Sequence, residues 1–290
     1  MCSILGLLNP GDEVIVFQPY FDFYTAAAAM AGATARFVTL RPPASGNGAF
    51  TFDAGELRRA FTARTKAIVV NTPHNPTGKV FTREELELIA GECLKRGVVA
   101  ITDEVYEHLI YEPGMPHIPM CTLPGMQDLT ITLSSLGKSF SLTGWKIGWA
   151  IAPPHLTAAV RAAHQFITFS SATPLQHGAA AAIRSPGDSV SRLRELFRSN
   201  RDRLSAALTA VGLTVYASHG TYFVMADHSA LGLGDDRAFC RYLAERVGVA
   251  AIPPSVFYSD PALGKNLVRF AYCKKAETMD EAIRRLGALG

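Results

Sequence analysis

Short apolar runs alternate with helix-like stretches in the first half of the chain, and this alternation constrains the fold most. Runs rich in Val and Ile predict strands at residues 13–17, 34–40, 66–71, 98–102, 129–134 and 147–151. They are apolar on both faces, as buried parallel strands are. Thr82 and Glu85 form a capping box ahead of apolar residues at helical spacing. The pattern predicts an α/β fold with a mostly parallel central sheet sandwiched by helices.

A second pattern begins at Ser185-Pro186-Gly187-Asp188. A long charged helix is expected at 189–211, strands at 213–216, 221–226 and 267–272, a helix at 235–247 and a final helix. Strands grouped with flanking helices are typical of an α+β unit. We therefore expect a large domain over 1–184 and a smaller C-terminal domain over 185–290.

Composition narrows the functional classes. The 290 residues are 48% hydrophobic, enough for a sizeable core, and the net charge of +3 is too even to favour nucleic acid or an anionic membrane. No apolar stretch approaches the length of a membrane span. The five cysteines are an odd number without a CxxC pair, which favours a reducing compartment. We expect a cytoplasmic protein, or an organellar one if a transit peptide is missing from this sequence.

An irregular turn follows the third predicted strand. It reads Asn71-Thr72-Pro73-His74-Asn75-Pro76-Thr77-Gly78. The carboxyl ends of strands are where α/β sheets bind ligands. Alone, however, such a turn is better explained by asparagines that satisfy their own backbone.

An acidic residue ends the next strand, in Asp103-Glu104-Val105-Tyr106. A carboxylate there is costly unless a positive group pairs with it, and a protonated pyridine nitrogen would be such a group. The Tyr106 hydroxyl would be available to a phenolic oxygen of the same ring. The alternatives are an Asp that caps a helix, or a metal site with Glu107 and His108, for which no recognised ligand spacing is present.

Two lysines follow the strand at 129–134. Lys138 lies among small and aromatic residues, where an amine can be desolvated and act as nucleophile and base. Lys146, eight residues on, could neutralise a phosphate together with the Ser135 hydroxyl. Without other context, two surface lysines in a polar turn explain the pattern better.

An arginine interrupts the last apolar run, in Leu267-Val268-Arg269-Phe270. A guanidinium there needs a carboxylate, either from a ligand or from a structural ion pair. No Walker A loop, strand-linked GxGxxG or GxSxG elbow competes with these sites.

Taken in order, the sites resemble the class I/II aminotransferases of the pyridoxal-phosphate fold-type I group, in the kynurenine, glutamine and methionine aminotransferase branch. The resemblance runs along the whole chain. It rests on NTPHNPTGKVFTREEL at 71–86, TDEVYEHL at 102–109, SSLGKSFSLTGWKIGWAIAP at 134–153, GTYFVMAD at 220–227, IPPSVFY at 252–258 and NLVRFAYCK at 266–274.

The resemblance implies a role for each matched residue. Lys138 is similar to the lysine that holds pyridoxal 5'-phosphate covalently and moves the proton, and Asp103 to the partner of the pyridine nitrogen. Asn75 and Tyr106 would bond the phenolic oxygen, and Asn75 with Arg269 the substrate carboxylate. The remaining matches are Ser135 and Lys146 at the phosphate, Phe21 stacked on the ring, and Asn71 beside Asn75.

The chain departs from the family at its beginning. Family members have an N-terminal arm and a glycine-containing phosphate loop, whose backbone donors take much of the phosphate charge. Residues 1–8 resemble the later part of the helix after that loop. We therefore expect the arm and loop to be missing, which leaves activity of this chain open.

The implied reaction moves an amino group from an L-amino acid to a 2-oxo acid with ping-pong kinetics, in a homodimer. Two alternatives stay open. One is a carbon–sulfur β-lyase that uses the same cofactor, and the other is a truncated, non-catalytic aminotransferase-like protein.

Overall fold

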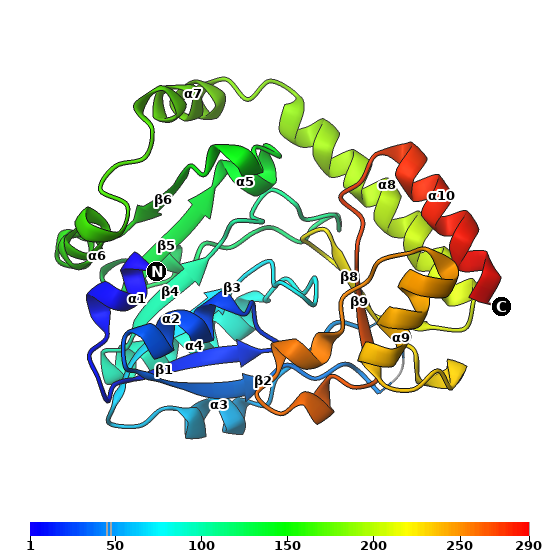
Figure 1. Ribbon diagram of the computed structural model, residues 1–290. Helices are drawn as coiled ribbons and strands as arrows, with labels where there is room; N and C mark the ends of the chain where they lie inside the picture. Colours follow the sequence, from blue (N-terminus) through cyan, green and yellow to red (C-terminus); the bar gives the residue numbers. More distant parts are fainter. Residues whose placement is uncertain (45, 47, 290) are drawn as a thin grey trace.

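The computed structural model describes residues 1–44, 46 and 48–289 and contains the predicted central sheet (Figure 1). Its strand order is β2-β1-β3-β4-β5-β6. The first five strands are parallel. The bounds are β1 Glu13–Gln18, β2 Thr34–Thr39, β3 Thr65–Asn71, β4 Val99–Asp103, β5 Thr130–Ser135 and β6 Gly148–Ile151.

The sixth strand corrects one prediction. The run at 147–151 was expected to be a buried parallel strand, but β6 pairs antiparallel with β5, and Ile151 is 62% exposed. A parallel return needs a crossover of a dozen or more residues, usually through a full helix. Only the four-residue α5 (Leu136–Ser139) and a short 3-10 turn, Thr143–Trp145, separate the two strands. The chain therefore doubles back at the edge of the sheet.

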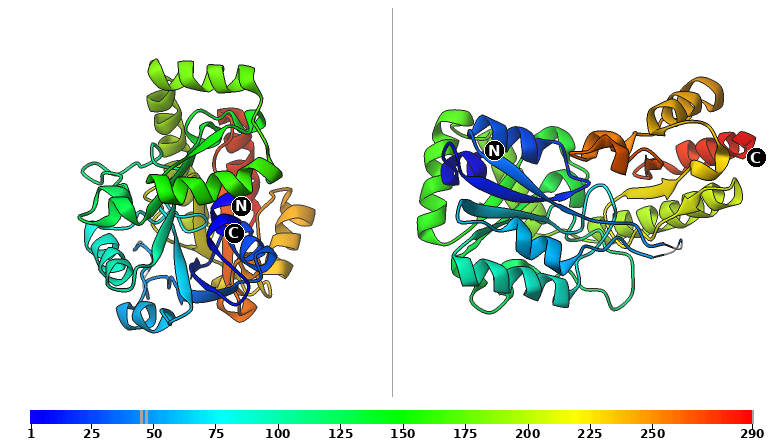
Figure 2. Two further views of the ribbon diagram at one scale, coloured as in Figure 1. Left: turned by 90° about the vertical axis from the view of Figure 1, so that its left-hand side faces the viewer. Right: turned by 90° about the horizontal axis from the view of Figure 1, so that it is seen from below.

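Helices cover both faces of the sheet, as predicted (Figure 2). Alternate residues of β1 point to opposite faces of the sheet and join different hydrophobic cores. Val14 and Val16 pack with α1 (Cys2–Leu7) and α2 (Phe23–Met30). Ile15 and Phe17 pack with α3 (Ala54–Ala60) and α4 (Arg83–Arg96). The capping box predicted at α4 is present, with Thr82 and Glu85 bonding each other's backbone N–H. α6 (Pro154–Ile167) packs closely on α1.

The C-terminal part contains a second sheet, of order β7-β8-β9 and antiparallel throughout. The strands are β7 Thr214–Val215, β8 Phe223–Asp227 and β9 Leu267–Ala271, and the helices nearby are α8 Ser189–Ala210, α9 Asp236–Tyr242 and α10 Ala276–Leu286. Tyr106, Leu109 and Tyr111 from the loop after β4 join the hydrophobic core of this unit. The domain boundary at 184/185 stays a prediction.

Two helices, α6 and α7 (Thr173–Arg184), extend along the side of the molecule away from this second sheet (Figure 1). Within the described ranges, no helix combines the length and the apolarity that crossing a membrane requires.

Candidate active site

The turn after β3 is tied to the end of β4 through Asn71. Its side-chain nitrogen donates to the backbone oxygen of Asp103 at 2.8 Å, and its side-chain oxygen accepts from the Asn75 backbone N–H at 2.7 Å. Both asparagines are buried. Asn71 therefore fixes the position of Asn75 relative to the end of β4.

His74 shows that this turn is a buried structure. Its Nδ1 lies 2.9 Å from the Thr77 hydroxyl, and burial, with a smaller effect of Lys79, lowers its pKa to about 3. The imidazole is therefore neutral at physiological pH, and His74 contributes a hydrogen bond to the turn but no ion pair.

Asp103 ends β4 next to a tyrosine that the sequence analysis did not single out. The Tyr24 hydroxyl donates to Oδ2 of Asp103 at 2.5 Å. Burial raises the pKa of Asp103, an effect opposed by the Tyr24 bond and more weakly by the positive charge of Lys138. Burial also raises the pKa of Tyr24 well above its ordinary value, so the phenol remains a donor. The carboxylate is thus available to a further positive group.

Lys138 lies in α5, and its amine points toward two tyrosines. Nζ lies 3.0 Å from the Tyr222 hydroxyl oxygen. It is also 5.8 Å from the centre of the Tyr106 ring and 5.7 Å from that of Tyr222, within the range of cation–π attraction. Burial raises the pKa of Tyr106 well above its ordinary value, so this hydroxyl also stays protonated.

Arg269 has no acidic partner in the part of the chain that the structure describes. Nη1 donates to the side-chain oxygen of Asn75 at 3.1 Å, and the guanidinium carbon lies 4.3 Å and 4.9 Å from the rings of Phe223 and Phe257. Nε is buried without a hydrogen-bond partner, and burial lowers the pKa of the guanidinium. A buried, unpartnered cationic donor favours a ligand carboxylate over the structural ion pair that the sequence left open.

The other predicted residues lie at the margin of this group. Ser135 ends β5 and lines a cavity of about 500 Å³ with Phe140, Trp149 and Arg194. Lys146 is exposed. Phe21 is 39% exposed, and its ring centre lies 5.6 Å from that of Tyr24.

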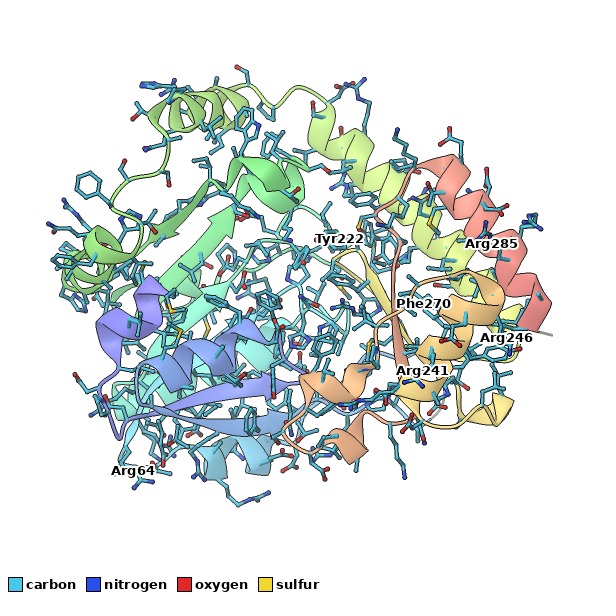
Figure 3. All side chains as sticks on the ribbon, viewed as in Figure 1. Arg64, Tyr222, Arg241, Arg246, Phe270 and Arg285 are labelled. Carbon is cyan, nitrogen blue, oxygen red and sulfur yellow. The ribbon has the colours of Figure 1, made fainter. Side chains whose placement is uncertain are left out.

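The structure thus brings together Asn71, Asn75, Asp103, Tyr106, Lys138 and Arg269, and adds Tyr24 and Tyr222. Figure 3 shows Tyr222 between the large sheet and α8. Each added residue had a signal: Tyr24 follows Phe21 by three residues, and Tyr222 lies in the GTYF segment. Neither signal indicates which side chain the tyrosine hydroxyl bonds.

The two glutamates that follow Asp103 belong to a separate cluster of polar side chains. Ligand atoms of Glu104, Glu107 and His117 all lie within 4.8 Å of one another. His117 Nε2 bonds Glu104 at 2.7 Å, and Ser134 donates to Glu107 at 2.7 Å. These bonds give each glutamate a polar partner within the protein.

The chain is similar in sequence and structure to known proteins. A family model described as "Aminotransferase class I and II" matches residues 2–286. The probable N-succinyldiaminopimelate aminotransferase DapC of Mycobacterium tuberculosis is 47% identical over 99% of this chain and 73% of its own length. Kynurenine–oxoglutarate transaminase 3 of Rattus norvegicus is 41% identical over 97% of this chain and 66% of its own.

Two solved structures of aminotransferases have the same fold as this chain. N-succinyldiaminopimelate aminotransferase from Mycobacterium tuberculosis superposes with a TM-score of 0.94 at 46% identity, covering 100% of this chain and 74% of that one. YbdL from Escherichia coli, whose structure is described with a methionine aminotransferase function, gives 0.92 at 35%, covering 98% and 73%. The expected fold type and branch are confirmed, and the chain belongs to the class I and II aminotransferase family.

Proposed function

We propose that this chain is a pyridoxal-phosphate-dependent transaminase in which Lys138 holds the cofactor and moves the proton. The observation that carries the proposal is the convergence of five residues at one place: Lys138, Asp103, Tyr106 and Asn75 lie at or after the ends of three strands of the large sheet, and Arg269 lies within β9. Family members normally use this cofactor and are typically dimers that act on amino acids and 2-oxo acids.

The residues fit the cofactor by their chemistry. Asp103 is a carboxylate whose pKa burial raises and which lacks a basic ion-pair partner among the described residues, so it suits a protonated ring nitrogen. Tyr106 and Asn75 would hold the phenolic oxygen, Phe21 would cover the ring, and Ser135 and Lys146 would hold the phosphate. The buried, unpartnered Nε of Arg269 suits a substrate carboxylate.

When bound, the cofactor supplies an electron sink for negative charge at the substrate α-carbon. Lys138 Nζ is the base that takes the α-proton and the acid that later returns it. Asp103 keeps a proton on the ring nitrogen, and Arg269 with Asn75 orients the amino acid through its carboxylate. One site serves donor and acceptor in turn, so we expect ping-pong kinetics.

A second copy of the chain would cover the end of α6 and the turn after it. Phe166 is 87% exposed, Ile167 47% and Phe169 80%, all within four consecutive residues. Apolar residues gathered on one surface mark interfaces, whereas isolated ones do not. We propose that this face carries the homodimer contact.

The test is a transamination assay with N-succinyl-LL-diaminopimelate, kynurenine and methionine as donors and 2-oxoglutarate as acceptor, with parallel lines expected in double-reciprocal plots. Arg269→Lys removes the bidentate fork and should lower kcat/KM by about 10-fold or more. Arg83→Lys, at an exposed residue of α4, is the control. A cysteine S-conjugate as a further substrate tests the β-lyase: pyruvate and ammonia formed from it without glutamate would indicate that enzyme. No reaction with any substrate would indicate a non-catalytic protein.

A further inference from the structure

Tyr222 makes the single side-chain hydrogen bond recorded for Lys138 within the described residues, across 84 positions of sequence. Lys138 forms no ion pair in that part of the chain, although it lies near Asp103. The phenol is therefore the group that fixes the direction of the amine.

The Tyr222 ring is held rigidly. Its centre lies 5.2 Å from that of Tyr106 and 6.0 Å from that of Phe197, both edge to face. Its backbone oxygen accepts from the N–H of Tyr272 at 2.9 Å. Rings packed at such angles lose rotational freedom, so the hydroxyl occupies a defined point.

The backbone is also constrained at Thr221, the residue before Tyr222. Thr221 is fully buried and has φ of 69°, a left-handed conformation that a β-branched residue adopts only when its surroundings enforce it. Its N–H donates to the Leu109 oxygen at 3.0 Å, and its own oxygen accepts from the hydroxyl of Tyr111. The chain thus enters β8 with Tyr222 aimed at α5.

We propose that Tyr222 is a positioning residue for Lys138: its hydroxyl accepts an N–H bond from Nζ and leaves the amine lone pair directed at the substrate. This inference rests on the proposed function. A free amine has two N–H bonds and one lone pair. If the phenol takes one N–H, the lone pair is free to accept the α-proton, and the resulting ammonium still has an N–H for the same oxygen. Tyr222 itself neither gains nor loses a proton.

The test uses Tyr222→Phe, which keeps the ring, and Tyr242→Phe, at a residue of α9 that is 36% exposed, as the control. Before cofactor is added, each chain is acylated with trace acetic anhydride, and Lys138 labelling is measured by mass spectrometry relative to exposed Lys95. A released amine should react about three-fold faster in Tyr222→Phe, because a hydrogen bond holds and shields it in the wild type. Equal labelling would overturn the proposal.

The second readout follows the half-reaction of the cofactor-loaded chain with methionine, with and without deuterium at the α-carbon. Tyr222→Phe should slow the half-reaction about 10-fold and enlarge the isotope effect, with substrate saturation within about two-fold of wild type. A loss through weaker saturation alone, with the isotope effect unchanged, would contradict a positioning role. Thermal melting identifies any loss of folding. If the wild type does not react, the proposed function fails, while the acylation result still decides the role of Tyr222.

Discussion

At the scale of single residues, the site depends on hydrogen bonds between groups far apart in sequence. Asp103 and Lys138 could be predicted from the sequence because each follows an apolar strand and lies in a recognisable motif. Their partners could not, since Tyr24 is 79 positions from Asp103 and Tyr222 is 84 from Lys138. A local pattern carries no information about which distant phenol reaches which side chain.

The Tyr24–Asp103 bond predicts a change in pH dependence. Burial raises the pKa of Asp103, so its carboxylate takes up a proton at higher pH than a free aspartate, while the Tyr24 bond favours the ionised form. Tyr24→Phe removes that bond, so the pKa should rise further and the acidic fall of kcat/KM should move to higher pH. On the acidic side of the profile we expect an activity loss of about three-fold or more, since a bond to a charged group is lost.

The measurement is a kcat/KM profile against pH for wild type, Tyr24→Phe and the exposed control Tyr242→Phe. A profile of Tyr24→Phe that overlies the wild type would show that the phenol does not act on Asp103. A uniform loss at every pH would point to displacement of the ring instead.

At the scale of elements, the turn after β3 depends on a close approach at Gly78. Gly78 has φ of 71°, and a Cβ there would lie 2.3 Å from the Ser218 hydroxyl and 2.9 Å from its Cα. The Gly78 oxygen also accepts from the backbone N–H groups of His219 and Gly220, both at 2.9 Å. Gly78 therefore joins the turn to the segment that leads into Tyr222.

Gly78→Ala should destabilise the protein by about 2–4 kcal/mol, from the left-handed backbone and the steric clash together. Gly91→Ala is the matched control, because Gly91 lies inside α4 with nothing within 4 Å of a Cβ. We expect that change to be neutral or to stabilise by up to about 1 kcal/mol. Urea unfolding measures both, and equal midpoints would refute the close approach.

Elements also differ in how well the sequence predicts them. Strands β1 to β5 and the cap of α4 were predictable, because apolar periodicity and Thr82-x-x-Glu85 are local signals. The direction of β6 was not, because an apolar run does not itself determine whether a strand pairs parallel or antiparallel with its neighbour. Direction follows from the connection, and the helix α5 inside it is only four residues long.

At the scale of the whole molecule, the exposed aromatic residues of α6 and the following turn predict self-association. Replacing both Phe166 and Phe169 by Ser removes the two most exposed rings of that face and should convert a dimer to a monomer. Met30→Ser is the control, at a 67% exposed apolar residue of α2. Analytical ultracentrifugation at several concentrations measures the mass. An unchanged dimer in the double variant would place the contact elsewhere.

The central claim is that Lys138 binds the cofactor, and the visible absorption spectrum of the 290-residue chain with pyridoxal phosphate tests it most directly. Wild type and Lys95→Ala, a change at an exposed lysine of α4, should show an absorption band near that of a lysine-bound cofactor after dialysis. Lys138→Ala should lack it, and methionine or another donor should bleach it in the wild type. A band that survives Lys138→Ala, or a wild type without one after dialysis, would contradict the account.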